Sequence, residues 1–100
     1  MTRLTIAIPN FNGGEKLKKA ITSCKLIKIP QDEFEILVVD NKSTDNSLEI
    51  IDKLKKEFPN LRLIENQENV GRIQNWNVCI KNCNSKYMTF LFINDLISRH

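Results

Sequence analysis

A run of four aliphatic residues, Ile36–Val39, stops abruptly at Asp40, and this junction constrains the fold more than any other stretch of the chain. Consecutive aliphatic side chains suit a strand covered on both faces, which indicates a parallel sheet under helices. Turn-forming residues follow, and a helical pattern begins at Leu48. A carboxylate at the end of such a strand lies on the edge where open α/β sheets bind ligands. Position alone leaves open whether Asp40 binds a ligand or only turns the chain and caps the next helix.

Strand and helix patterns alternate along the whole chain. Strands are expected at Leu4–Ile8, Glu35–Val39, Leu61–Glu65 and Tyr87–Ile93. Helical spacing predicts three intervening helices, whose inward stripes are Leu17, Ala20, Ile21 and Cys24, then Leu48, Ile51, Leu54 and Phe58, then Ile73, Trp76, Ile80 and Cys83. The order βαβαβαβ with short links predicts right-handed crossovers and one parallel sheet. If the third helix crosses back over the first strand, the strand order is 3-2-1-4, with a crevice between strands one and four.

Polar side chains at the ends of the predicted strands converge on that crevice: Asn10, Asn12, Asp40, Asn94 and Asp95. Common nucleotide motifs are missing, since neither G-x-G-x-x-G nor G-x-x-x-x-G-K-[ST] occurs. A strand-end carboxylate suits a hard cation such as Mg²⁺ or Mn²⁺, with diphosphate oxygens and water completing its shell. A second carboxylate can accept hydrogen bonds from a ribose or a base. Phosphatases and phosphotransferases use similar sheet edges, so these residues alone do not select one reaction.

Composition narrows the class of protein further. The net charge of +3 comes without a basic run of five or six residues, which argues against a nucleic-acid partner. No apolar segment approaches the roughly 18 residues of a membrane helix, and the N-terminus does not resemble a signal peptide. A cytoplasmic location is therefore expected. The cysteines, Cys24, Cys79 and Cys83, fall within helical patterns and are expected to be reduced, mostly buried thiols.

Four segments in order resemble the motifs of family 2 glycosyltransferases. Ile6–Asn12 is similar to their opening strand with Pro-x-aromatic-Asn, and Val38–Asp45 to their strand ending in Val-Asp-Asp/Asn-x-Ser-Thr-Asp. Asn69–Arg72, leading into the helix at Asn75–Asn77, resembles their Asn-x-Gly loop. Phe90–Asp95 falls where the family places its Asp-x-Asp-like metal motif. The four motifs cover nearly the whole chain.

The resemblance implies a GT-A fold, a Rossmann-like α/β domain that binds a nucleotide diphosphate sugar, with UDP favoured. It implies inverting, hexosyltransferase-like transfer to an acceptor hydroxyl, in cell-surface polysaccharide biosynthesis. The nucleotide-binding residues carried over from the motifs are Pro9, Asn10, Phe11, Asn12, Asp40, Arg72 and Asn94. Asp95 would bind the Mg²⁺ or Mn²⁺ ion. For Arg72, a solvated loop residue remains the alternative, and for Phe11 a packing role. Trp76 is expected in the core.

Two departures from the family pattern shape the expectation. Ile93-Asn94-Asp95 replaces consecutive or alternating acids, which would weaken metal binding. Family members also continue into an acceptor-binding half that carries the catalytic base, so residues 1–100 are expected to be a truncated donor-binding domain, inactive alone. The competing interpretation is a non-catalytic interaction or assembly module, with a homodimer covering apolar surface that the truncation exposes. Peripheral association of the full-length parent with the inner face of the membrane is a further expectation.

Overall fold

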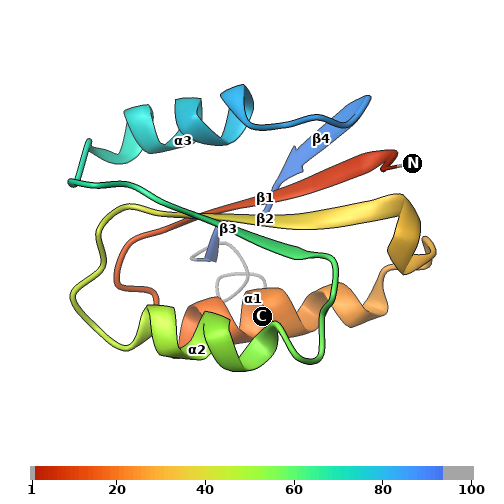
Figure 1. The fold of residues 1–100 in the computed structure, drawn as a ribbon, viewed down its shortest axis with the longest axis horizontal. Helices are drawn as coiled ribbons and strands as arrows, with labels where there is room; N and C mark the ends of the chain where they lie inside the picture. Colours follow the sequence, from red (N-terminus) through yellow and green to blue (C-terminus); the bar gives the residue numbers. More distant parts are fainter. Residues whose placement is uncertain (1, 94–100) are drawn as a thin grey trace.

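Strands and helices alternate along the chain, and the strands form one parallel sheet whose two faces are covered by the helices (Figure 1). The computed structural model describes residues 2–93. The strands are β1 (Leu4–Asn10), β2 (Phe34–Asp40), β3 (Leu61–Glu65) and β4 (Tyr87–Phe90). The helices are α1 (Glu15–Ser23), α2 (Ser47–Leu54) and α3 (Arg72–Lys81), with short 3₁₀ turns η1 (Cys24–Leu26) and η2 (Gln31–Glu33). The order β3-β2-β1-β4, all parallel, confirms the predicted fold class.

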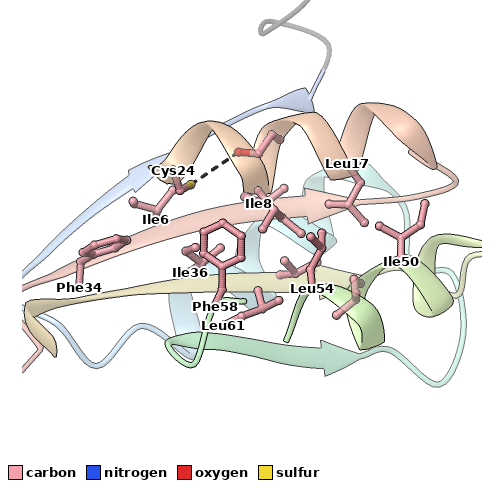
Figure 2. Packing of buried hydrophobic residues seen from close by; sticks show 14 residues of the cluster. Ile6, Ile8, Leu17, Cys24, Phe34, Ile36, Ile50, Leu54, Phe58 and Leu61 are labelled. Carbon is pink, nitrogen blue, oxygen red and sulfur yellow. Dashed lines mark hydrogen bonds between the residues drawn. The ribbon is translucent and has the colours of Figure 1, made fainter. Parts of the chain in front are cut away.

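The main core lies between the sheet and the layer of α1 and α2 (Figure 2). Ile6 and Ile8 of β1, and Ile36 and Val38 of β2, point toward these helices and are fully or almost fully buried. Leu17 on α1 meets them from the helix side. Each buried aliphatic side chain of this kind contributes about 1.5–3 kcal/mol relative to exposure. The predicted inward stripe of α1 is therefore confirmed.

A smaller core on the opposite face of the sheet packs against α3 alone. It contains Ala7, Leu37 and Val39 from the alternate positions of β1 and β2, together with Cys79 of α3. Because both faces of β2 are covered, its whole aliphatic run is buried, as the unbroken apolar pattern predicts. α3 lies on this side and the α1–α2 layer on the other (Figure 1).

The first strand continues two residues past the predicted end. Pro9 lies inside β1 opposite Val39. Along a parallel strand, the backbone groups of successive residues point alternately to one neighbouring strand and to the other. The Asn10 carbonyl oxygen accepts the Asn41 N–H on the β2 side. The Ala7 carbonyl oxygen accepts the Leu91 N–H on the β4 side, and Pro9 points to the same side as Ala7. The missing N–H of Pro9 therefore faces the side on which β4 has already ended at Phe90, and no ladder bond is lost.

The predicted inward stripe of α3 is wrong. Ile73 and Ile80 are 58% and 53% exposed, whereas Asn75 and Cys79 are buried against the sheet. The Asn75 side chain donates to the Val39 carbonyl oxygen over 3.2 Å, and this bond holds a polar residue on the inner face of the helix. Apolar periodicity fails here because a hydrogen bond to the sheet, not apolar area, sets the helix rotation. α2 also ends at Leu54, and Phe58 reaches the core from the turn that follows.

Candidate functional site

A crevice of about 630 Å³ opens at the carboxyl edge of the sheet, beside the ends of β1 and β2 and the start of α3. The winding direction of the sheet changes between β1 and β4, so the crevice lies where the topology predicts it. Its lining comes from strand ends, the loops that follow them, and α3. The lining residues are Pro9, Asn10, Phe11, Asn41, Asn69, Arg72, Asn75, Trp76, Phe92 and Ile93.

Asp40 lies behind this lining and anchors the loop that follows β2. It is 1% exposed, and its carboxylate accepts the Ser43 backbone N–H over 2.9 Å and the Ser43 hydroxyl over 2.6 Å. The Asn10 side-chain amide donates to the same carboxylate over 2.9 Å. Between Asp40 and Ser43, Lys42 adopts a positive φ of 64°, which tightens the turn. Both carboxylate oxygens thus have partners inside the protein, and none of these bonds caps α2.

Asn12 joins the loop after β1 to the loop after β2. Its side-chain oxygen accepts the backbone N–H of Thr44 over 2.7 Å and that of Asp45 over 3.2 Å. Its own backbone N–H donates to the Ser43 hydroxyl over 2.9 Å. Asn12 is therefore a loop-joining residue outside the crevice lining, whereas Pro9, Asn10, Phe11 and Arg72, also predicted as nucleotide contacts, line it.

Side-chain amide hydrogen bonds connect four asparagines at the crevice, three of which line it. Asn41 Oδ1 accepts from Asn66 Nδ2 over 3.0 Å and from the Val70 backbone N–H over 2.9 Å. Asn41 Nδ2 donates to Asn69 Oδ1 over 3.0 Å and to the Gly71 carbonyl oxygen over 3.3 Å. Asn66 Nδ2 also donates to Asn75 Oδ1 over 2.7 Å. Both acceptor and both donor positions of the Asn41 side chain are thus occupied, and this residue fixes the loop that leads into α3 at Arg72.

The far end of the crevice is aromatic and cationic. The Arg72 guanidinium lies 5.8 Å from the centre of the Trp76 ring, and Trp76 lies 5.2 Å from Phe92. Phe92 in turn stacks on Phe90 at 5.3 Å between ring centres. Trp76 is half-buried in the crevice wall, so its assignment to the core is corrected. The rotation of α3 explains the error. Because Asn75 occupies the inner face of the helix, Trp76 is turned toward the strand ends.

Phe11 adds a further aromatic ring to the lining of the crevice. It is 48% exposed and follows directly after β1. A half-exposed aromatic ring can stack on a planar base, and a guanidinium in the same lining can attract phosphate oxygens. Asn41, Asn69, Asn75, Trp76, Phe92 and Ile93 join the lining without having been predicted as contacts. For Asn41 a signal was present in its position immediately after a strand-end Asp.

The metal assignment falls on residues beyond the described part. Asn94 and Asp95 lie outside residues 2–93, although Ile93, two positions before Asp95, lines the crevice. Within residues 2–93, no three His, Cys, Asp or Glu side chains gather as metal ligands would. The described lining carries amides, aromatic rings and one guanidinium, so these residues alone do not fit a divalent cation.

No helix within residues 2–93 is long and apolar enough to cross a membrane.

Comparison with known proteins agrees with the fold and the motifs. Residues 5–91 match the family model for glycosyl transferase family 2. A poly(ribitol-phosphate) beta-glucosyltransferase of Bacillus spizizenii is 32% identical over 95% of this chain, and the chain spans 15% of that relative's length. The poly(ribitol-phosphate) beta-N-acetylglucosaminyltransferase TarS of Staphylococcus aureus is 27% identical over 99% of the chain, which spans 17% of that relative.

Solved structures show the same architecture. TarS residues 1–349, crystallised in complex with UDP, superpose with a TM-score of 0.84 at 26% identity, covering 93% of this chain and 28% of that one. A mannosyltransferase of Pyrobaculum calidifontis shares the fold with a TM-score of 0.84 at 21% identity, over 92% of this chain and 27% of its own. The matches in sequence motif, strand order and fold all agree, and the chain belongs to glycosyl transferase family 2, with a GT-A fold.

Proposed function

We propose that the crevice binds the nucleotide part of a nucleotide diphosphate sugar, most favourably UDP, for transfer of the sugar to an acceptor hydroxyl with inversion. The observation that carries this proposal is the placement of Phe11 and Arg72 on the lining of one crevice at the switch point of the sheet. Phe11 offers a ring for the base, and Arg72 offers a guanidinium suited to diphosphate oxygens. Support comes also from TarS, which is solved with UDP and with UDP-GlcNAc.

The surrounding residues would act mainly by positioning. Pro9 and Asn10 bring Phe11 to the end of β1, while Asp40 and Asn12 hold the two loops behind it. This assignment gives Asp40 a supporting role in place of direct contact with the base. A divalent cation, Mg²⁺ or Mn²⁺, would supply positive charge to the leaving diphosphate, and Asp95 is the residue we assign to hold it, with Asn94 beside it as a hydrogen-bonding group.

Transfer by this chain alone is not expected. Inverting transfer needs a base to take the proton of the acceptor hydroxyl, and the described crevice lining contains no carboxylate or histidine. The chain also spans only 15% and 17% of the length of the two relatives named above, so the whole activity of those relatives is not assigned to it. By analogy with those two poly(ribitol-phosphate) glycosyltransferases, a polyol-phosphate polymer is the class of acceptor that we propose.

An amide NMR titration with UDP, with and without Mn²⁺, tests the proposal, with ADP as the control for base preference. We expect shifts at Phe11, Asn41 and Arg72, and Mn²⁺-dependent broadening around Asp95 only when UDP is present. Millimolar UDP that leaves the crevice resonances unchanged would remove the nucleotide-binding function.

A second candidate, self-association as an interaction module, is favoured by exposed apolar side chains on α3 and β4. Ile73, Ile80 and Tyr87 are each more than half exposed. Burying them against a second copy would remove apolar surface from water. Light scattering over a concentration series decides between the states: a dimer that dissociates in the Ile80→Lys variant supports this candidate, and a monomer at all concentrations excludes it.

A further inference from the structure

The positive charge of this protein is concentrated on one segment, which comprises α1, the η1 turn and the residues directly after it. Residues 15–28 contain five lysines and one glutamate, a net charge of +4, whereas the whole chain carries +3. All other residues together therefore sum to −1. The crevice lies elsewhere, on residues at the sheet edge and α3, so the nucleotide site does not account for this basic segment.

The lysines lie on the outer face of α1 and on the η1 turn. Leu17, Ala20 and Ile21 fill the inner face of α1, which leaves Lys18 and Lys19 on the side away from the sheet. A shallow hollow of about 590 Å³ on that side is lined by Glu15, Lys18, Lys19, Thr22, Ser23, Lys25 and Leu26, so three lysines and one glutamate border it. We call this surface, with Lys16 and Lys28 at its margins, the basic face.

An apolar side chain lies among these cations. Leu26 is 82% exposed, more than any other large hydrophobic residue in the described part of the chain. It ends the η1 turn between Lys25 and Lys28. An isolated exposed leucine is ordinary on a protein surface. A leucine flanked by lysines can instead enter the boundary between headgroups and acyl chains while the ammonium groups remain at the phosphates.

Most charges of the basic face are not neutralised within the protein. Lys25 lies 3.8 Å from a Glu57 carboxylate oxygen and 5.8 Å from the centre of the Phe58 ring. Within residues 2–93, Lys16, Lys18, Lys19 and Lys28 make no ion pair. These side chains are exposed and can reach an external anion without breaking an internal contact.

We infer that the basic face docks on an anionic phospholipid bilayer, with the lysines on the lipid phosphates and Leu26 inserted between headgroups. A nucleic acid or another soluble polyanion would use the lysines but would have no use for Leu26. In the docked state the α1–α2 layer faces the lipid and α3 faces away from it (Figure 1). The crevice at the sheet edge then opens along the membrane plane. This inference goes beyond the proposed function and does not depend on it.

Co-sedimentation with vesicles tests the inference. We expect the protein to bind vesicles of equimolar phosphatidylglycerol and phosphatidylcholine at low salt and to be released from them at high salt. It should not bind vesicles of phosphatidylcholine alone. The double variant Lys18→Glu/Lys19→Glu should bind at least about 25-fold more weakly, because each lysine near an anionic surface contributes roughly a fivefold change. The matched control Lys81→Glu/Lys86→Glu makes the same change in net charge at the end of α3 and in the segment before β4, outside the basic face, and should bind like the parent protein.

The Leu26→Ser variant separates a bilayer from a soluble polyanion. We expect it to lose about tenfold in vesicle affinity while keeping its affinity for inorganic polyphosphate. Equal vesicle binding by Leu26→Ser and the parent would overturn insertion and leave simple adsorption of lysines on anions. Equal losses of vesicle affinity in the two double-charge variants would overturn the inference, because they would show that binding depends on net charge and not on the position of the basic face. Amide spectra check folding, and UDP titration of each variant reports on the crevice separately.

Discussion

Asn10 and Asp40 end adjacent parallel strands, pair directly in register, and join through a 2.9 Å hydrogen bond from the Asn10 amide to the Asp40 carboxylate. Both side chains are 1% exposed. This contact links the loop that presents Phe11 to the loop held by Ser43. The strand-end carboxylate therefore supports the crevice from behind, and its removal should act first on stability.

The Asp40→Asn variant should lower the free energy of unfolding by about 2–3 kcal/mol. The carboxylate accepts hydrogen bonds from Asn10 and from two groups of Ser43, and bonds to a charged acceptor contribute about 1.5–3 kcal/mol. Urea denaturation measures the change. Asp52→Asn, on the exposed face of α2, is the matched control and should stay within about 0.5 kcal/mol of the parent. Equal effects at the two positions would contradict an anchoring role for Asp40.

The Asn41→Asp variant should also destabilise the fold, by about 2 kcal/mol, and weaken UDP binding. A carboxylate cannot donate to Asn69 Oδ1 or to the Gly71 carbonyl oxygen, and it would face both oxygens with negative charge. The loop that leads into α3 at Arg72 would then shift. Asn77→Asp, on the exposed side of α3, makes the same chemical change without this network and should be nearly neutral. Denaturation and UDP titration of both variants provide the comparison.

These two positions also show what the sequence could and could not predict. The aliphatic run Ile36–Val39 specified a doubly covered strand, and alternation of periods specified the parallel sheet. The order 3-2-1-4 was predicted on the condition that the third helix crosses back over the first strand, and the structure has that order. The motifs placed Pro9, Asn10, Phe11 and Arg72 at the crevice. Strand ends are predictable in this way because topology alone brings them to one edge.

Side-chain hydrogen bonds account for what the sequence did not predict. The amide network of Asn41, Asn66, Asn69 and Asn75 joins residues up to 34 positions apart, and a single sequence has no local period that would reveal it. Asn75 turns α3 so that Ile73 and Ile80 face solvent and Trp76 reaches the crevice wall. Asp40 was predicted at the correct edge, but its burial follows from the Ser43 turn, which position alone does not specify.

The Phe11→Ala variant should weaken UDP binding roughly 5- to 100-fold, since stacking of a base on an aromatic ring contributes about 1–3 kcal/mol. Phe11 is 48% exposed, so stability should change little. Phe11→Tyr keeps the ring and should retain binding. Isothermal titration with UDP and with uridine makes the comparison, and both ligands should lose affinity equally. Undiminished uridine affinity in the alanine variant would exclude stacking on Phe11.

Arg72 should discriminate between UDP and uridine. The Arg72→Ala variant removes the one charged side chain of the described crevice lining, and we expect UDP to bind about tenfold more weakly while uridine binding stays unchanged. Arg72→Lys keeps the charge but loses the planar fork, so an intermediate affinity is expected. Lys81→Ala, at the other end of α3, is the control for charge. A loss that is the same for UDP and uridine would assign Arg72 to the base or to the loop instead of the diphosphate.

Two buried thiols should make stability fall in alkaline solution. Burial raises the pKa of the Cys24 thiol, and of the Cys79 thiol, from 9.0 to about 11. The unfolded chain loses these protons near pH 9, while the folded chain holds them until about pH 11. Their contribution to stability is therefore complete below about pH 9 and is lost as the pH rises to about 11.

Urea unfolding at a series of pH values measures this loss. The Cys24→Ala and Cys79→Ala variants should each show a shallower decline than the parent. Iodoacetamide should modify Cys83 in the native protein well before Cys24 and Cys79, and all three at similar rates in urea. If the two buried cysteines react in the folded protein as fast as in urea, the α1 and α3 contacts that bury them are not maintained in solution.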